Sequence, residues 1–125
     1  MPLIPDIVFE ALQLLETPAV FATVDSSSRP NAIYVMLVKS DDRRSVLISD
    51  GAMNKSRENI RHGSHGSVVF LTKELRAFQI KGTIKYHVSG PLFDYYPDGK
   101  DPNHPRHGLK ELVVDEVYEG AEKLL

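Results

Sequence analysis

The chain has 125 residues, of which 42% are hydrophobic and 26% charged, and its formal net charge is -2. These proportions predict a single folded domain over residues 1–125 and exclude a disordered chain or a dedicated nucleic-acid binder. Cysteine is absent, which excludes disulfides, thiolate catalysis and zinc–cysteine sites. No apolar run approaches the ~20 residues that span a bilayer, and the start of the sequence lacks a signal-peptide pattern. We therefore expect a cytoplasmic protein with no membrane contact.

The first predicted element is a short amphipathic helix over residues 6–15. Apolar residues recur there at helical spacing. Asp6 is placed to cap the start of this helix. Thr17-Pro18 is expected to end it, because the residue before a proline disfavours helical geometry.

A β-hairpin is predicted next. Residues 20–24 and 32–38 are two apolar runs, and residues 25–30 between them are rich in turn-forming types. The second run is apolar at successive positions instead of alternating. This pattern indicates either a strand buried on both faces, one toward the core and one toward a ligand or partner, or a plain interior strand.

The segment after the third predicted strand, residues 45–49, has features of an anion-binding site. A glycine turn leads into a predicted helix over about 54–61, which Asn54 caps and which begins with Lys55 and Ser56. Free backbone N–H groups and the positive end of the helix dipole would attract a phosphate. The motif is not a nucleotide P-loop, because Asn54 stands where that motif has glycine. A solvated first helical turn is the alternative interpretation.

The second half of the chain predicts three more strands, over residues 68–72, 78–89 and 112–118. Residues 78–89 alternate apolar and polar side chains and give the clearest strand pattern. Residues 91–108 contain four prolines and predict a surface loop. Six strands with short connections and two short helices favour a small, mainly β, antiparallel barrel, because closure removes exposed sheet edges.

Neither a metal site nor a catalytic group stands out. Asp101, His104 and His107 are the nearest approach to a metal site, but Pro102 and Pro105 disfavour the helix that a His-x-x-His site needs. We expect no metal. The sequence contains no evident Ser–His–Asp combination and no carboxylates visibly placed for acid–base chemistry, so the catalytic residues are left unassigned. An enzyme with this sequence would depend on a redox cofactor.

Three stretches resemble the FMN-binding split barrel of the pyridoxamine 5′-phosphate oxidase-like superfamily, particularly its short single-domain FMN-binding proteins. They are Arg29-Pro30-Asn31, residues 51–56 together with Asn59-Ile60, and residues 78–83. The resemblance implies a six-stranded antiparallel split β-barrel of Greek-key type with two or three short α-helices. It also implies a homodimer with FMN at the subunit interface. The expected function is that of a flavin-dependent oxidoreductase or an electron-transfer protein, with an unidentified electron donor or substrate.

The resemblance also assigns roles to individual residues. Lys55 and Ser56 would hold the FMN phosphate. Residues of the second and third strands would lie along the isoalloxazine and the ribityl chain, and Gln79 and Lys81 would reach the flavin from the same subunit or its partner. The implied cofactor-binding residues are Tyr34, Val35, Met36, Ser49, Asp50, Gly51, Met53, Lys55, Ser56, Asn59, Gln79 and Lys81.

Two departures from the family limit this expectation. The chain is shorter than the vitamin-forming oxidases and lacks their C-terminal substrate-gripping region, so we do not expect that activity. It also has no tryptophan, which some short relatives place near the flavin. The alternatives are a non-redox binding module of the same fold, holding haem, a deazaflavin or a phosphorylated metabolite, and a cofactor-free structural dimer.

Overall fold

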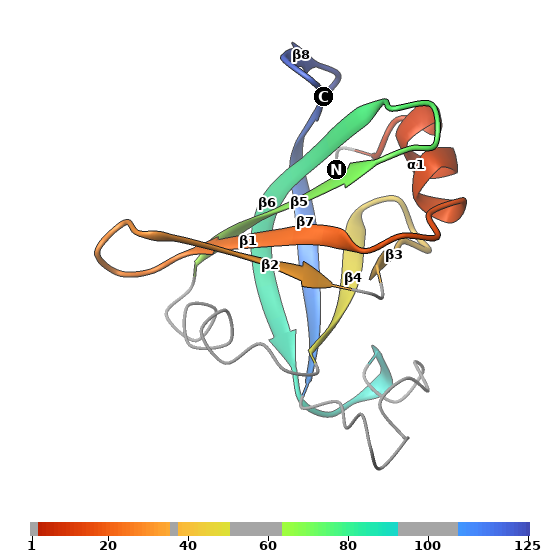
Figure 1. Ribbon diagram of the computed structural model, residues 1–125. Helices are drawn as coiled ribbons and strands as arrows, with labels where there is room; N and C mark the ends of the chain where they lie inside the picture. The colour runs from red at the N-terminus through yellow and green to blue at the C-terminus, as the bar shows by residue number, and fades with distance from the viewer. Residues whose placement is uncertain (1–2, 36–37, 51–63, 93–107) are drawn as a thin grey trace.

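The computed structural model describes residues 3–35, 38–50, 64–92 and 108–125, and these form a mainly β, antiparallel fold. The described part contains one helix of about two turns, α1, and eight strands (Figure 1). The elements are α1 (Asp6–Gln13), β1 (Ala19–Val24), β2 (Pro30–Val35), β3 (Val38–Lys39), β4 (Ser45–Asp50), β5 (His65–Leu71), β6 (Ala77–His87), β7 (Gly108–Glu119) and β8 (Glu122–Lys123). The predicted helix over 54–61 and most of the predicted loop over 91–108 lie outside these residues.

The predicted N-terminal helix is present as α1, but both of its ends differ from the prediction. Pro5 occupies the N-cap position, and Asp6 makes no capping hydrogen bond; its carboxylate instead pairs with Arg43. The helix ends at Gln13, two residues early: Leu14 is its C-cap, and Leu15 N–H donates to the carbonyl oxygen of Leu12 in a tighter final turn. Val8 and Leu12, one helical turn apart, are the buried residues of α1.

The sheet curls back toward itself as a half-barrel, and its two edge strands are almost continuous in sequence. Its strands follow the order β2-β1-β5-β6-β7-β4-β3, and β8 pairs with β7. The predicted strand over 32–38 is therefore two strands, since β2 pairs with β1 and β3 pairs with β4. Three Cα–Cα steps join Val35 to Val38, so the two ends of the sheet lie within roughly 11 Å of each other. Figure 1 shows the resulting curl, with β1 and β2 crossing in front of β6 and β7.

The six-strand prediction misses β3 and β8, each of two residues, and misplaces several strand ends. β5 begins at His65, three residues earlier than predicted, and β7 begins at Gly108, four residues earlier. Both added segments pair with β6: β5 pairs along Ala77–Thr83 and β7 pairs along Phe78–His87. β6 ends at His87, two residues before the predicted end, since Gly90 beyond it has a positive φ of 99° and turns the chain away.

The core lies inside the curled sheet and is covered at one end by α1. It draws buried apolar side chains from α1 and from each of β1 to β7. The predicted alternation is confirmed from Phe78 to Lys85, where Phe78, Ile80 and Ile84 are buried on the inner face, but Val88, predicted on the same face, lies beyond β6 and is 60% exposed. The outer face of β6 consequently carries its polar side chains, which places Gln79 and Lys81 on the surface of the sheet.

A two-armed ion pair joins the start of β6 to the end of β7. Arg76 donates from Nε and Nη2 to the two carboxylate oxygens of Glu119, each over 2.7 Å. These hydrogen bonds lower the pKa of Glu119 below its ordinary value of 4.5, and burial opposes them only in part. Between the lowered pKa and the ordinary pKa, the folded chain therefore binds fewer protons than the unfolded chain. The stability that the ion pair contributes is complete above the ordinary pKa and is lost as the pH falls through the lowered pKa.

We expect Glu119→Gln to reduce the loss of unfolding free energy that accompanies a fall in pH. The measurement is urea unfolding at a series of pH values from about 6 to about 3. The wild type should lose more unfolding free energy over this range than Glu119→Gln, by a small amount because the pair is solvent-exposed. Glu122→Gln, on the exposed strand β8, is the control and should follow the wild type. Parallel profiles for the wild type and Glu119→Gln would contradict the assignment.

Candidate functional site

The outer face of the sheet carries a row of side chains, here called the tyrosine row, that runs across five neighbouring strands. The strand registers pair Tyr34 with Val20, Val20 with Val69, Val69 with Gln79, and Gln79 with Tyr118. Tyr34 is 77% exposed and Val69 is 36% exposed. Val20, Gln79 and Tyr118 are half-buried. Large apolar side chains are usually buried, so a row that leaves Tyr34 and Val69 exposed marks a contact surface.

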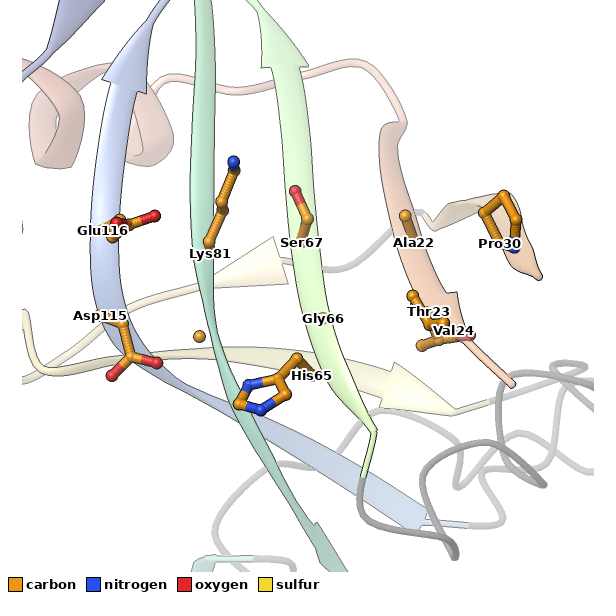
Figure 2. A pocket seen from close by; sticks show the side chains of 11 residues that line it. Ala22, Thr23, Val24, Pro30, His65, Gly66, Ser67, Lys81, Asp115 and Glu116 are labelled. Atoms are coloured by element: carbon orange, nitrogen blue, oxygen red, sulfur yellow. The ribbon is translucent and has the colours of Figure 1, made fainter. Parts of the chain in front are cut away.

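A second row, here called the lysine row, lies beside the first and is more polar. It consists of Ala32, Ala22, Ser67, Lys81 and Glu116, which are cross-strand partners in that order. In Figure 2, Ala22, Ser67, Lys81 and Glu116 stand on neighbouring strands in this order. The row presents a hydroxyl, an ammonium and a carboxylate to the outside, all of which can bind polar groups of a ligand.

Hydrogen bonds and a cation–π contact fix the side chains of the two rows relative to each other. Gln79 donates from Nε2 to Ser67 Oγ over 2.7 Å. The Lys81 ammonium lies 4.8 Å from the centre of the Tyr118 ring. Glu116 accepts a bond of 3.4 Å from the Tyr118 hydroxyl and pairs with Lys123 at 3.4 Å. These contacts hold Gln79 and Lys81 at the surface as oriented donors.

A groove of about 460 Å³ extends the lysine row toward the β1–β2 hairpin. Lys81, Ser67 and Glu116 line it on one side, and Val24, His65 and Asp115 line it on the other (Figure 2). The walls combine apolar surface with groups of both charges. A groove with this lining suits an uncharged or zwitterionic organic group better than a compact anion.

A β-bulge places two carboxylates in the groove. Lys81 pairs with Glu116 but Gly82 pairs with Val114, so Asp115 is an extra residue in β7. Because the bulge resets the alternation of β7, Asp115 and Glu116 both line the groove although they are consecutive. Gly82 makes the bulge possible, since a Cβ atom there would lie 1.9 Å from the carbonyl oxygen of Val113.

The cofactor-binding residues implied by the sequence fall into three groups. Tyr34, Gln79 and Lys81 lie on the outer face, whereas the side chain of Val35 is buried in the core and only its backbone is available to a ligand. Ser49 and Asp50 end β4, where the structure describes their backbone alone. The remaining implied residues, Met36, Gly51, Met53, Lys55, Ser56 and Asn59, lie outside the described residues, as do Asp101, His104 and His107.

Within one chain, the two described parts of the implied site are far apart. The β7 partners of Ser49 and Lys81 are Leu109 and Glu116. These partners are about seven residues apart, which corresponds to roughly 23 Å at ~3.3 Å per residue. Tyr34 lies nearer to Ser49, because the chain passes from β2 to β3 within three residues and β3 pairs with β4. The structure therefore does not bring Lys81 and Ser49 together.

Sequence reasoning missed several residues of this surface. Val20, Val69 and Tyr118 were predicted to be strand residues, but their shared row depends on the registers of separate strands, which no local pattern gives. Asp115 was placed inside a strand without a sign of the bulge. The only local signal was the Asp115-Glu116 pair, which interrupts an otherwise apolar run.

Among the described residues, no group of three or more histidine, aspartate or glutamate side chains is placed to hold a metal ion. The described part of the chain also contains no helix long and apolar enough to cross a membrane.

The family model for pyridoxamine 5′-phosphate oxidase matches residues 8–119, which cover almost all of the described fold. The chain belongs to this family. The match includes both rows of the outer face and the bulge. No curated protein sequence matches the chain.

Solved structures with the same fold come from several bacteria. HupZ of Group A Streptococcus is 16% identical with a TM-score of 0.79, and the alignment covers 96% of each chain. An FMN-binding protein of Syntrophomonas wolfei is 13% identical with a TM-score of 0.76, and the alignment covers 92% of this chain and 87% of that one. A heme-binding protein of Mycobacterium smegmatis is 15% identical with a TM-score of 0.61, covering 93% of this chain and 54% of that one. At such identities the likeness shows the fold.

Proposed function

We propose that the protein is an FMN-binding flavoprotein that works as an oxidoreductase or an electron-transfer protein. The observation that carries the proposal is the outer face of the sheet, where an exposed Tyr34 and the half-buried Gln79 and Lys81 lie beside a mixed-charge groove in a chain of this family. A flavin supplies the redox chemistry when it is bound, and the protein supplies binding, orientation and electrostatics. The likeness to an FMN-binding protein of the same fold supports the choice of FMN.

The side chains of the described part suit an isoalloxazine, which is a flat ring system edged with hydrogen-bond donors and acceptors. Gln79 and Ser67 offer neutral polar groups, Lys81 offers a cation, and Tyr34 offers an exposed aromatic ring. Lys55 and Ser56 would hold the phosphate at the start of a helix. Met36, Ser49, Asp50, Gly51, Met53 and Asn59, with the backbone of Val35, complete the proposed set.

We further propose that two copies of the chain form the site together. The separation of Ser49 from Lys81 within one chain supports this, because one flavin would contact both groups only if a second copy supplied one of them. The exposed tyrosine row supports it also, since a homodimer would bury this surface. Gln79 and Lys81 of one copy would then face Tyr34, Ser49 and Asp50 of the other.

Val69→Lys tests the dimer. Val69 lies at the centre of the tyrosine row and is already 36% exposed, so the change should leave the fold intact and place two like charges in the buried interface. At low micromolar concentration the mass measured by light scattering should fall toward the 14.0 kDa of one chain, and FMN binding should weaken in parallel. Thr83→Lys, on the outer face of β6 but outside both rows, is the control. A dimeric Val69→Lys protein would contradict the proposed interface.

Haem is the second candidate ligand. It is favoured by the heme-binding protein of the same fold and by the exposed His65 at the groove, because histidine is a common axial ligand of haem iron. Mass spectrometry and the absorption spectrum of whatever co-purifies with the protein separate the candidates. FMN as the released ligand supports the proposal, whereas haem as the only released ligand would replace it.

A further inference from the structure

The two long hairpins of the sheet turn in the same way. In each, five residues link the strands and the fourth has a left-handed backbone: Ser28 has φ 64° in the β1–β2 turn and Leu75 has φ 64° in the β5–β6 turn. Ser28 N–H donates to Asp25 over 3.0 Å, and Leu75 N–H donates to Thr72 over 3.0 Å. A turn of this kind normally has glycine or asparagine at the left-handed position, because a Cβ atom raises the energy of that backbone.

Leucine is an unusual residue for this position, and its side chain contributes little to the folded chain. Leu75 is 75% exposed, so burial does not offset the cost of its backbone conformation. Its side chain has no polar atom that could hydrogen-bond to the turn, in contrast to Ser28. A single exposed leucine is ordinary, but one held in a left-handed conformation points to a role outside the fold.

A second groove, of about 390 Å³, lies beside this turn, between it and α1. Figure 1 shows the β5–β6 turn and α1 at the same corner of the molecule. The apolar walls of the groove include Ile7, Leu14 and Leu71, of which Leu14 is 77% exposed and Leu71 is 51% exposed. The corner thus presents a protruding apolar side chain and an apolar hollow next to each other.

The charges around this corner are of both signs. Lys73 pairs with Glu16 at 3.3 Å, and both side chains are largely exposed, which leaves them available to a second partner. Glu10 and Glu74 also line the groove. Arg76 also lines the groove. A protruding side chain beside a hollow, and cations beside carboxylates, supply both halves of a contact between two copies related by a twofold axis.

We propose that this corner is a docking surface for a second copy of the chain. Leu75 of each copy enters the groove of the other, and Lys73 of each faces the acidic rim of the other. Leu71 of the hollow lies two residues beyond Val69 of the tyrosine row in β5, so the two contacts occupy adjacent parts of the surface, and the second would join flavin-binding dimers into a larger assembly. Contact through Leu75 and the groove does not depend on a bound ligand. It is weaker than the dimer contact, because it buries a smaller apolar area.

Leu75→Asn tests this docking surface, because asparagine tolerates the left-handed backbone and replaces the protruding apolar side chain with a polar one. Light scattering and sedimentation at concentrations up to about 1 mM should show the wild type associating beyond the dimer. Leu75→Asn should raise the unfolding temperature and weaken this association by at least about tenfold. Ser28→Asn, at the equivalent position of the other hairpin, is the matched control and should associate like the wild type.

Leu14→Gln provides an independent variant in the hollow, where a 77% exposed side chain is changed with little effect on folding. It should weaken the same association. The double variant Leu14→Gln/Leu75→Asn should lose no more affinity than the single variant with the larger loss, because both changes remove the same contact. A wild type that remains dimeric at ~1 mM would overturn the proposal. Unchanged association of Leu75→Asn would overturn it also.

Discussion

Gly82→Ala should destabilise the protein by about 3 kcal/mol or more, or prevent folding. The new Cβ atom would lie 1.9 Å from the carbonyl oxygen of Val113 and 2.8 Å from its carbonyl carbon. Both atoms belong to the backbone, so no side-chain rotation relieves the clash. Either β6 and β7 must separate at the bulge or β7 must shift its register. The measurement is the midpoint of urea unfolding, followed by circular dichroism.

Gly66→Ala is the control for this prediction, because Gly66 is the cross-strand partner of Gly82 in the same sheet. A Cβ atom at Gly66 would lie 2.4 Å from Cδ1 of Ile84, which is the far end of a flexible side chain. The expected cost is about 1 kcal/mol, at the low end of the range for overpacking. Equal stability of the two variants would show that Gly82 is not required for the close approach at the bulge.

Lys55→Ala should weaken FMN binding by ~1.5 to 3 kcal/mol, which is about 10- to 150-fold in the dissociation constant. Under the proposed function Lys55 holds the FMN phosphate, and a hydrogen bond to a charged group contributes in this range. Because Lys55 lies outside the described residues, the prediction rests on the sequence motif and the family. The affinity is measured by the quenching of FMN fluorescence on titration with the protein.

Lys73→Ala is the matched control, since it removes the same charge from an exposed corner that the proposed flavin site does not include. Its FMN affinity should equal that of the wild type. Riboflavin, which lacks the phosphate, offers a second comparison. The wild type and Lys55→Ala should bind riboflavin equally, and a Lys55→Ala protein that keeps full affinity for FMN would contradict the phosphate assignment.

The parts of the fold that the sequence predicted are those with a strong local pattern. β6 alternates apolar and polar residues along its length, and its inner side chains Phe78, Ile80 and Ile84 are buried as expected. The β1–β2 turn was also predicted, because residues 25–30 are rich in turn-forming types. In the structure the Asp25 carboxylate accepts hydrogen bonds from the backbone N–H groups of Ser27 and Arg29, as aspartate commonly does in turns.

The parts that the sequence did not predict depend on contacts between distant segments. The first four residues of β7 include Lys110 and Glu111, whose polarity suggests a loop, yet Lys110 is fully buried between paired strands. The apolar run over 32–38 reads as one strand, and only the pairing of β3 with β4 shows that it divides. The bulge at Asp115 is likewise set by the approach of Gly82, which is more than thirty positions away.

For the candidate site, the sequence identified which faces of the strands carry polar side chains, but not which of these side chains become neighbours in the sheet. Gln79 and Lys81 were assigned to the polar face of β6, and the structure places them there. Their neighbours Ser67, Tyr118 and Glu116 come from other strands and became visible only through the registers. The separation of Lys81 from Ser49 also needed the full sheet order, and it is what supports a site shared between two copies.

The most direct test of the central claim is an FMN titration of ligand-free protein, with the mass of the complex measured in the same samples. The proposed function predicts saturable binding of one FMN per chain, with quenching of flavin fluorescence and the mass of a dimer. It also predicts that Val69→Lys and Lys55→Ala both weaken this binding. Absence of binding at FMN concentrations up to about 1 mM, where even a weak site would fill, would contradict it.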